Sequence, residues 1–274
     1  MNKTAGEIVS EVLMLSSVKK GCAFLIVEGR DDWKFWKTRV HTLCEIIDST
    51  GKTEGVAAVR RLNGRGFVGH VGVFDRDYQD ALAKSNWQSN EIYWDAHSLE
   101  TVHFFSAAFD AAFLEHVDQA RLMALQLQVG EPLRNVVERI AAAVGTIRYV
   151  HFLSGSTGDA SRLFPTNFVR TNPFSFDLNA LLSTGVEIGA APSVVQLQAR
   201  IAEYADISAR LLIRGHDVSA LTAWMIRSCG GACGHERVEQ IFRLTFAQED
   251  LAKTAVYLDL QQWEAARVPR RVLK

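Results

Sequence analysis

The chain has 274 residues, of which 48% are hydrophobic and 22% are charged. This composition excludes a disordered chain and supplies enough apolar material for a large core, so we expect one elaborated domain or two. Lys and Arg total 30 against 31 Asp and Glu, a formal charge of -1. This balance excludes a strongly basic nucleic-acid binder and an acidic tail, so any polyanionic partner must be held by local patches.

Cysteine content and hydropathy bear on the cellular compartment. The four cysteines are too few for a disulfide scaffold, and Glu7 and Glu11 stand where a signal peptide would need an apolar core. We therefore expect a cytoplasmic protein. No apolar stretch approaches the roughly 20 residues of a membrane helix, so we expect a soluble protein without membrane contact.

Short apolar runs alternate with helical patterns through the first part of the chain. After a short helical lead-in, apolar runs predict strands at residues 22–27, 44–48, 70–74 and 91–94. The first run is apolar throughout, as in a parallel strand buried on both faces. Helical spacing lies between these runs at residues 30–40 and 56–62, and a further helix is expected from about Ser98. The alternation predicts an α/β domain over residues 1–105, with right-handed crossovers between its strands.

From about residue 107 the pattern becomes mainly helical. Apolar residues from Leu133 to Val144 recur at helical spacing, and similar runs continue to Met225. Between them, residues 155–173 are rich in Gly, Ser, Thr, Asn and Phe, which predicts a loop or short irregular strands. We therefore expect a helical domain over residues 106–274, which would serve partner docking or dimerisation.

Acidic residues follow three of the predicted strands. Glu28 follows the first strand, Asp75 and Asp77 follow the third, and Glu100 comes shortly after the fourth. Open α/β sheets bind ligands at this edge. On an extended segment Asp75 and Asp77 would point to the same side, and crowded carboxylates favour a bound cation such as Mg²⁺. The set predicts a metal site for phosphodiester hydrolysis; the alternative is that these acids cap helices or end strands, which is the favoured interpretation for Asp31.

Two of these segments resemble the paired signature of the Toprim family. They are Leu25-Ile-Val-Glu-Gly-Arg-Asp-Asp32 and Val73-Phe-Asp-Arg-Asp-Tyr78. Two further segments, Tyr93-Trp-Asp-Ala-His-Ser-Leu-Glu100 and Arg214-Gly-His-Asp217, are similar to the AriB-like Toprim effectors of PARIS anti-phage systems, which are encoded beside ABC-type ATPases. The Toprim resemblance covers about residues 20–105, and the resemblance to the subgroup extends with weaker motifs over most of the chain.

The resemblance implies a small parallel sheet between helices and a nuclease that uses Mg²⁺ or Mn²⁺. By position, it makes Glu28 the catalytic acid or base and a metal contact, and it makes Asp75 and Asp77 the catalytic metal pair. Asp32 and Glu100 become further metal ligands. The implied substrate is a tRNA or another RNA, with DNA still open.

The resemblance also implies a partner. An ABC-type ATPase of the same defence locus would restrain the nuclease until infection is sensed, and the chain could form a homodimer. The alternative is a non-catalytic Toprim-like module that docks to the ATPase and regulates it.

Several basic residues are candidates for binding substrate phosphate. Lys52 lies in the run Ser49-Thr-Gly-Lys-Thr53, which imitates the end of a P-loop but lacks the first glycine of that motif, so we expect no ATP hydrolysis. Lys52 could contact a phosphate or be a solvated turn residue. Arg60, Arg61 and Arg65 could form a phosphate patch or an ordinary charged helix end. The basic segment 267–274 is a second candidate patch, or a frayed tail.

Two late segments have weaker signals. Cys229, Cys233 and His235 invite a zinc interpretation with His216 as a possible fourth ligand, but their spacing differs from that of the usual Cys pairs. The intervening glycines suit a loop between helices. His216 precedes an apolar helix, which favours a hydrogen-bond network at a helix start over catalysis.

Overall fold

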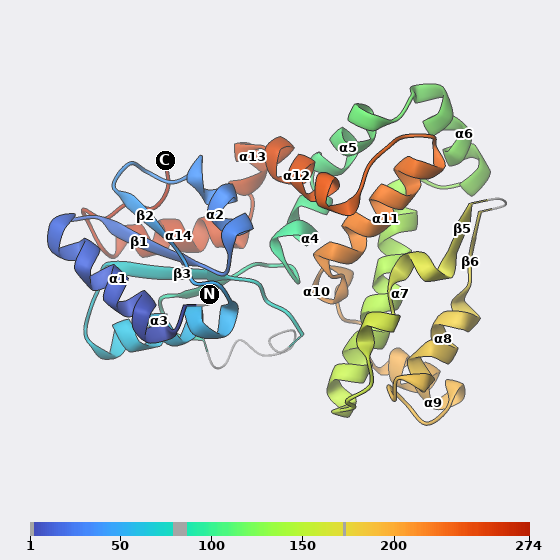
Figure 1. The fold of residues 1–274 in the computed structure, drawn as a ribbon, viewed down its shortest axis with the longest axis horizontal. Coiled ribbons are helices and arrows are strands. Elements are labelled where there is room, and N and C mark those ends of the chain that lie inside the picture. Colours follow the sequence, from blue (N-terminus) through green and yellow to red (C-terminus); the bar gives the residue numbers. More distant parts are fainter. Residues whose placement is uncertain (1–2, 79–86, 172–173) are drawn as a thin grey trace. The chain divides into compact units, whose positions relative to one another are not determined.

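In the computed structural model, residues 3–78, 87–171 and 174–274 are described, and they pack into two compact units. The first unit holds residues 3–76, 87–95 and 247–274, and the second holds residues 77–78 and 96–246. The change from one unit to the other therefore falls before the predicted boundary at residue 105. The segment after residue 246, predicted as part of the helical domain, packs with the first unit. Figure 1 shows the elements of both units.

The first unit has an α/β architecture, and its four strands lie at the positions that the apolar runs predict. Its sheet is parallel, with the strand order β2-β1-β3-β4. The helix predicted from residue 56 begins earlier, at Lys52, because its first turn is polar and carries no apolar period. The described elements of this unit are α1 (Ala5–Val18), β1 (Ala23–Val27), α2 (Arg30–Lys37), β2 (Cys44–Asp48), α3 (Lys52–Gly64), β3 (His70–Phe74), β4 (Glu91–Tyr93), α13 (Gln248–Leu251) and α14 (Ala255–Ala265).

The strand order makes the carboxyl ends of β1 and β3 a switch point of the sheet. From β1 the chain passes through α2 to β2 on one side, whereas β4, the strand that follows β3 in the chain, lies on the other side. Right-handed crossovers then place α2 and α3 on opposite faces of the sheet. Open α/β sheets bind ligands outside such a switch point, so the fold directs attention to the residues that follow β1 and β3.

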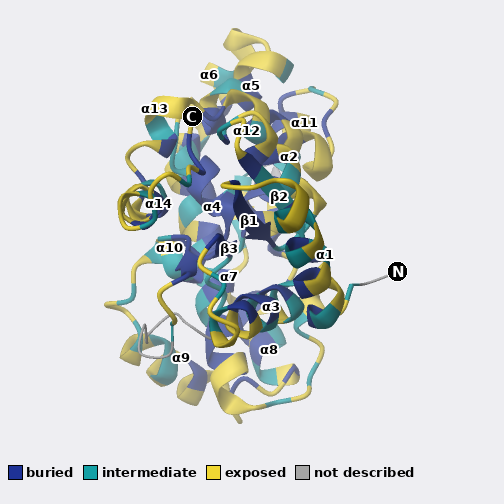
Figure 2. Cartoon of the chain, turned by 90° about the vertical axis from the view of Figure 1, so that its left-hand side faces the viewer, coloured by how far each residue is buried: buried dark blue, intermediate teal, exposed yellow. Residues whose placement is uncertain are grey.

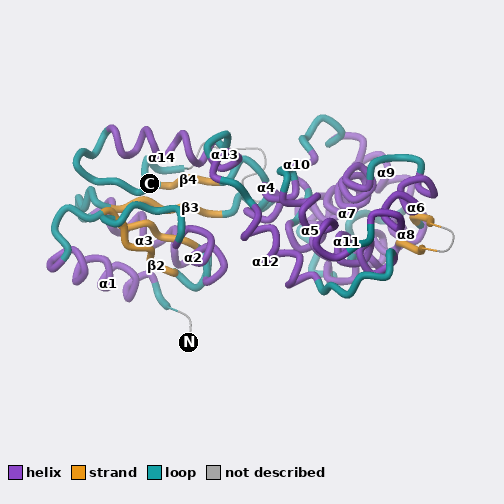
Figure 3. The backbone as a smooth tube through the Cα atoms, turned by 90° about the horizontal axis from the view of Figure 1, so that it is seen from above, coloured by secondary structure: helices purple, strands orange, loops and turns teal. Residues whose placement is uncertain are grey.

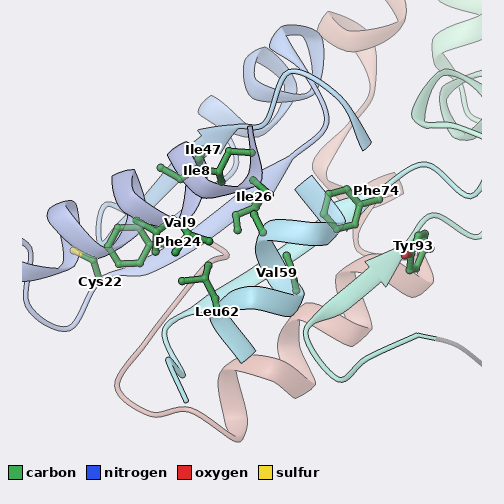
Figure 4. Packing of buried hydrophobic residues seen from close by; sticks show 13 residues of the cluster. Ile8, Val9, Cys22, Phe24, Ile26, Ile47, Val59, Leu62, Phe74 and Tyr93 are labelled. Atoms are coloured by element: carbon green, nitrogen blue, oxygen red, sulfur yellow. The ribbon is translucent and has the colours of Figure 1, made fainter. Parts of the chain in front are cut away.

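The core of the first unit lies between the sheet and its helices. Phe24 and Ile26 of β1 join Ile8 of α1 and Val59 and Leu62 of α3 in one buried cluster (Figure 4). Figure 3 shows α14 on the opposite side of the strands from α1. All five residues of β1 are buried (Figure 2), which explains why this run is apolar throughout.

The basic segment after α14 is docked on the first unit, which corrects the prediction of a frayed tail. Leu273 forms an antiparallel bridge with Val40, and the His41 N–H donates to the Val272 carbonyl at 2.7 Å. The carboxylate of Glu264 accepts hydrogen bonds from the Val272 and Leu273 amides at 2.5 and 2.6 Å. Val272 and Leu273 are both buried, so this apolar pair anchors a segment whose overall composition is basic.

The second unit is mainly helical, as the sequence predicts. The apolar face expected around Leu133 to Val144 is buried along α7, which packs against α11. The predicted loop contains two 3₁₀ turns and the strand β5, which pairs with β6 just after the loop; residues 172 and 173 lie outside the described part. The described elements are α4 (Leu99–Phe104), α5 (Ala108–His116), α6 (Gln119–Val129), α7 (Leu133–Ser154), η1 (Ala160–Arg162), η2 (Pro165–Phe168), β5 (Val169–Thr171), β6 (Phe174–Phe176), α8 (Leu178–Glu187), α9 (Val194–Glu203), α10 (Ala209–Leu212), α11 (Gly215–Ser228) and α12 (His235–Thr245).

Hydropathy along the helices bears on membrane association. Across the described parts of both units, none of the helices is apolar over a length that would let it span a bilayer.

Candidate functional site

Glu28 joins the carboxyl ends of β1 and β3. It directly follows β1, and its Oε1 accepts a hydrogen bond of 2.6 Å from the backbone N–H of Asp75, the residue that follows β3. The two strands are neighbours in the sheet, with Val27 opposite Val73. The structure therefore brings Glu28 and Asp75 together at the switch point, and both residues are partly exposed there.

The Asp32 side chain points back toward the turn Glu28–Gly29, which follows β1. Its Oδ2 accepts a hydrogen bond of 3.2 Å from the N–H of Gly29, the N-cap of α2, because the third residue of a helix can reach the N-cap amide. Asp31 instead pairs with Lys34 at 2.9 Å on the exposed side of α2. Gly29 is thus the N-cap, and Asp32 supplies the side-chain capping hydrogen bond; its carboxylate lies next to the Glu28–Gly29 turn.

Lys52 brings a positive charge to the same edge of the sheet. It is the first residue of α3, and its Nζ donates to the carbonyl of Arg76 at 3.2 Å. Its ammonium also lies 5.4 Å from the centre of the Tyr93 ring. Because Arg76 directly follows Asp75, the ammonium group lies beside the end of β3, where it can attract a phosphate.

Asp77 does not continue the strand. β3 ends at Phe74, and Asp77 has a φ of 52°, in the left-handed region that Asp adopts more readily than most residues. The expectation that alternation on an extended strand aligns Asp75 with Asp77 is therefore wrong. Asp77 belongs to the second unit, where its N–H donates to the His97 carbonyl at 3.1 Å and its Oδ1 lies 4.0 Å from His97 Nδ1.

Glu100 also belongs to the second unit, where it lies beside the Arg214–Asp217 segment. It is in the first turn of α4, and its Oε2 accepts a hydrogen bond of 3.0 Å from Ser98 Oγ. A Cβ on Gly215, the first residue of α11, would lie 2.5 Å from both Ser98 Oγ and the Glu100 Cβ. The two segments that resemble the subgroup of Toprim effectors therefore meet here, and only glycine permits their close approach.

The rest of the Arg214–Asp217 segment is held by two polar contacts. His216 Nδ1 lies 2.8 Å from Glu239 Oε1 of α12, and this hydrogen bond raises the pKa of His216. Asp217 forms a buried ion pair with Arg148 of α7; their side chains are 2% and 4% exposed. The contact of His216 agrees with the predicted hydrogen-bond network, whereas the Arg148 partner had no signal in the sequence pattern.

The three arginines predicted as a phosphate patch lie at the other end of α3 from Lys52. Arg60 donates to both carboxylate oxygens of Glu91, at 2.6 and 3.1 Å, and the Glu91 side chain is fully buried. Arg61 and Arg65 are exposed toward the end of the 13-residue helix, about 14 Å and about 20 Å from its start. Because α3 leads from the end of β2 back to the start of β3, these residues lie near the amino ends of the strands. They therefore lie away from the strand ends that carry Glu28 and Asp75.

The late cysteines, which invite a zinc interpretation, are both buried. Burial raises the pKa of the Cys229 and Cys233 thiols. Within the described ranges, no three His, Cys, Asp or Glu side chains are gathered closely enough to hold a metal ion.

The carboxylates of the first unit nevertheless suit Mg²⁺ by their chemistry. Glu28, Asp32 and Asp75 provide oxygen donors alone, the type that this cation takes. Mg²⁺ commonly binds through one or two protein carboxylates and completes its octahedron with water and substrate oxygens, so a closed cluster of three side chains is not required. The hydrogen bond from the Asp75 amide holds the Glu28 carboxylate in place at such a site.

A comparison with models of known protein families gives no match to this chain, and a comparison with curated protein sequences gives none either. Fold alone does not specify function. A functional proposal must therefore start from the geometry of the site and from the motifs at residues 25–32 and 73–78.

Proposed function

We propose that the chain is a metal-dependent nuclease of the Toprim type that hydrolyses phosphodiester bonds. The observation that carries this proposal is the hydrogen bond between Glu28 and the Asp75 amide at the switch point of the sheet. It gathers one acidic residue from each of two neighbouring strand ends at the edge where such sheets bind ligands. Lys52 adds a cation at the same edge.

Each residue of this edge has a proposed role. Glu28, held by an N–H donor, would accept a proton from the attacking water and later return one to the leaving oxygen. The Lys52 ammonium would neutralise part of the phosphate charge. Glu28, Asp75 and Asp32 would hold Mg²⁺ or Mn²⁺. When bound, the ion supplies Lewis-acid polarisation of the phosphodiester.

We further propose a role in anti-phage defence. The resemblance of residues 93–100 and 214–217 to PARIS effectors suggests a tRNA or another RNA as substrate, with DNA as the alternative. It also suggests an ABC-type ATPase as the partner that releases the nuclease, in the cytoplasm. The close packing of Gly215 on Glu100 places these two segments in contact with each other.

Glu28→Gln is the sharpest test of the catalytic site. The amide oxygen of glutamine can accept the same hydrogen bond from the Asp75 N–H, whereas the negative charge and the basicity are lost. Cleavage of labelled tRNA, other RNA and DNA by the purified chain with Mg²⁺ or Mn²⁺ should fall about 100-fold or more. Asp31→Asn, which removes an exposed carboxylate nearby, should cleave at the wild-type rate. Equal cleavage by Glu28→Gln and the wild type would refute the site.

A measurement in cells complements the assay, because an effector can require its partner for activity. The full chain is expressed with the ABC-type ATPase that is proposed as its partner, and cell growth is followed after the system is triggered. Glu28→Gln should relieve toxicity, and Asp31→Asn should not. Toxicity that persists unchanged in Glu28→Gln would favour the non-catalytic module.

A further inference from the structure

The second unit contains a cavity of about 490 Å³ that the proposed nuclease chemistry does not use. One face of α7 forms part of its wall, because Arg148, His151 and Phe152 recur at helical spacing near the end of that helix. Tyr78 and Arg214, the residue before α11, also line it; Figure 1 shows α7 and α11 in this unit. The volume lies within the range of roughly 300–1,000 Å³ that is usual for small-molecule sites.

Two buried polar atoms in the cavity wall have no hydrogen-bond partner within the described chain: His151 Nε2 and Arg148 Nε. His151 is only 8% exposed. Arg148 is fixed by its other nitrogens, since Nη1 pairs with Asp217 and Nη2 donates to the Leu163 carbonyl at 2.7 Å. Buried polar groups are nearly always paired in folded proteins, so these two atoms indicate a place where a ligand supplies the partner.

Arg214 provides the cavity with a positive charge that no carboxylate engages directly. Its guanidinium makes no hydrogen bond or ion pair with the residues that the structure describes, whereas the charge of Arg148 is matched by Asp217. Asp77 also lines the cavity, and its carboxylate repels an anion but can accept a hydrogen bond from a hydroxyl group. An anionic group of a ligand therefore belongs at Arg214.

Aromatic rings line the same cavity. The Tyr78 hydroxyl donates to the Leu212 carbonyl at 3.2 Å, which fixes this ring 4.7 Å from His97 and 6.2 Å from Phe152, measured between ring centres. Phe152 is 44% exposed, an unusual exposure for a large aromatic side chain. Exposed aromatic faces stack with planar rings, and nucleobases are the common biological case.

We propose that this cavity binds a nucleotide. Arg214 holds the phosphate, Phe152 and Tyr78 contact the base, and His151 and Arg148 meet polar atoms of the base or the ribose. An apolar ligand would leave His151 Nε2, Arg148 Nε and the Arg214 guanidinium without partners, and a simple carboxylate would leave the aromatic faces unused. The nucleotide can be free or can be one unit of a single-stranded nucleic acid, because the recognised chemistry is the same.

Binding is measured with the full chain in buffer that contains EDTA, so that it does not depend on the proposed nuclease activity. One arm titrates 5′-mononucleotides by calorimetry, and the other titrates a fluorescently labelled single-stranded RNA of eight nucleotides by anisotropy. Arg214→Gln removes the phosphate contact, and Phe152→Ala removes a stacking face; each should weaken binding about tenfold or more. The arm that shows the tighter binding identifies the source of the nucleotide.

Matched variants separate this site from general charge attraction and from loss of folding. Arg170→Gln removes an exposed arginine of β5 in the same unit, and Leu153→Ala removes an exposed apolar side chain next to Phe152; both should bind as the wild type does. Thermal melting checks that every variant is folded, and Arg214→Lys should retain part of the affinity because it keeps the charge. The proposal is overturned if neither probe binds, or if Arg214→Gln and Phe152→Ala weaken binding no more than their controls do.

Discussion

Trp263 donates its indole N–H to the side-chain oxygen of Asn90 at 3.2 Å, and Arg267 donates to the same oxygen at 2.6 Å. Asn90 directly precedes β4 and is buried, and its amide nitrogen donates to Asn63 Oδ1 at 2.7 Å. One buried amide therefore links α3, β4 and α14, three elements of the first unit that are far apart in the sequence.

Replacing Asn90 by alanine should loosen the C-terminal segment of the first unit. The buried Trp263 N–H and the Arg267 guanidinium would lose their acceptor, which costs about 1–3 kcal/mol of unfolding free energy. Hydrogen exchange should accelerate selectively in residues 255–274, and denaturant unfolding should give the free energy. Gln88→Ala, which removes an exposed amide that also bonds to Asn63, serves as the control and should change stability by less than about 0.5 kcal/mol.

His70 should make the protein less stable in acid. Its ring is fully buried, with Nε2 3.1 Å from the Val59 carbonyl, and burial lowers the pKa of His70 to about 4 from a usual value of 6.5. Between these two values the unfolded chain binds the proton and the folded chain does not, so unfolding free energy falls as the pH falls through this window. The contribution of His70 to this loss is about 3 kcal/mol.

The measurement is the free energy of unfolding at pH 7 and at pH 4. His70→Phe keeps a ring that can pack against Phe67 but cannot titrate. Between pH 7 and pH 4 this variant should therefore lose about 3 kcal/mol less unfolding free energy than the wild type loses. The variant can be less stable at pH 7, because Val59 loses a donor, without affecting this difference. An unchanged pH dependence would contradict the prediction, and the exposed His235→Gln is the control.

Gly215→Ala should destabilise the second unit. The added methyl group would lie 2.5 Å from the Ser98 hydroxyl oxygen and the Glu100 Cβ, so α11 and α4 must separate. Overpacking of this kind costs about 1–3 kcal/mol, and thermal melting followed by circular dichroism should reveal it. Gly234→Ala, where a Cβ would meet no heavy atom within 4 Å, should melt close to the wild type. Equal melting of the two variants would show that the contact at Gly215 is not tight.

Mg²⁺ or Mn²⁺ should stabilise the folded chain if the acidic edge binds metal. A ligand present at 100 times its dissociation constant stabilises the folded state by about 2.7 kcal/mol, and EDTA should reverse the effect. Glu28→Gln should reduce the metal-dependent rise in melting temperature, and Asp31→Asn should preserve it, because its carboxylate is exposed and paired with Lys34. A rise of the same size in Glu28→Gln would exclude Glu28 as a metal ligand.

The sheet could be predicted because its strands are short apolar runs that end at polar residues. The order of the strands could not, since periodicity contains no information on which strands pair, and the approach of Glu28 to Asp75 depends on that order. The left-handed backbone at Asp77 also left no pattern, because one residue with positive φ interrupts an extended segment without changing its composition.

Charged residues were the hardest to place from sequence. Arg60 has the same local pattern as a surface arginine, but its partner Glu91 lies 31 residues away in a strand where an acidic side chain is unexpected. Arg148 and Asp217 likewise lie on apolar helices, and only tertiary structure makes them a pair. Long-range ion pairs of this kind have no signature in a local window of sequence.

The docking of Val272 and Leu273 also affects the time at which the first unit can complete its fold during synthesis. The segment 247–274 leaves the ribosome after the whole of residues 96–246, about 150 residues later than β4. At about 5–20 residues per second, roughly 9–36 s pass between the synthesis of β4 and that of Leu273, which pairs with Val40. A nascent chain that still lacks this last segment would therefore carry Glu28 and Asp75 on a sheet that α14 does not yet cover.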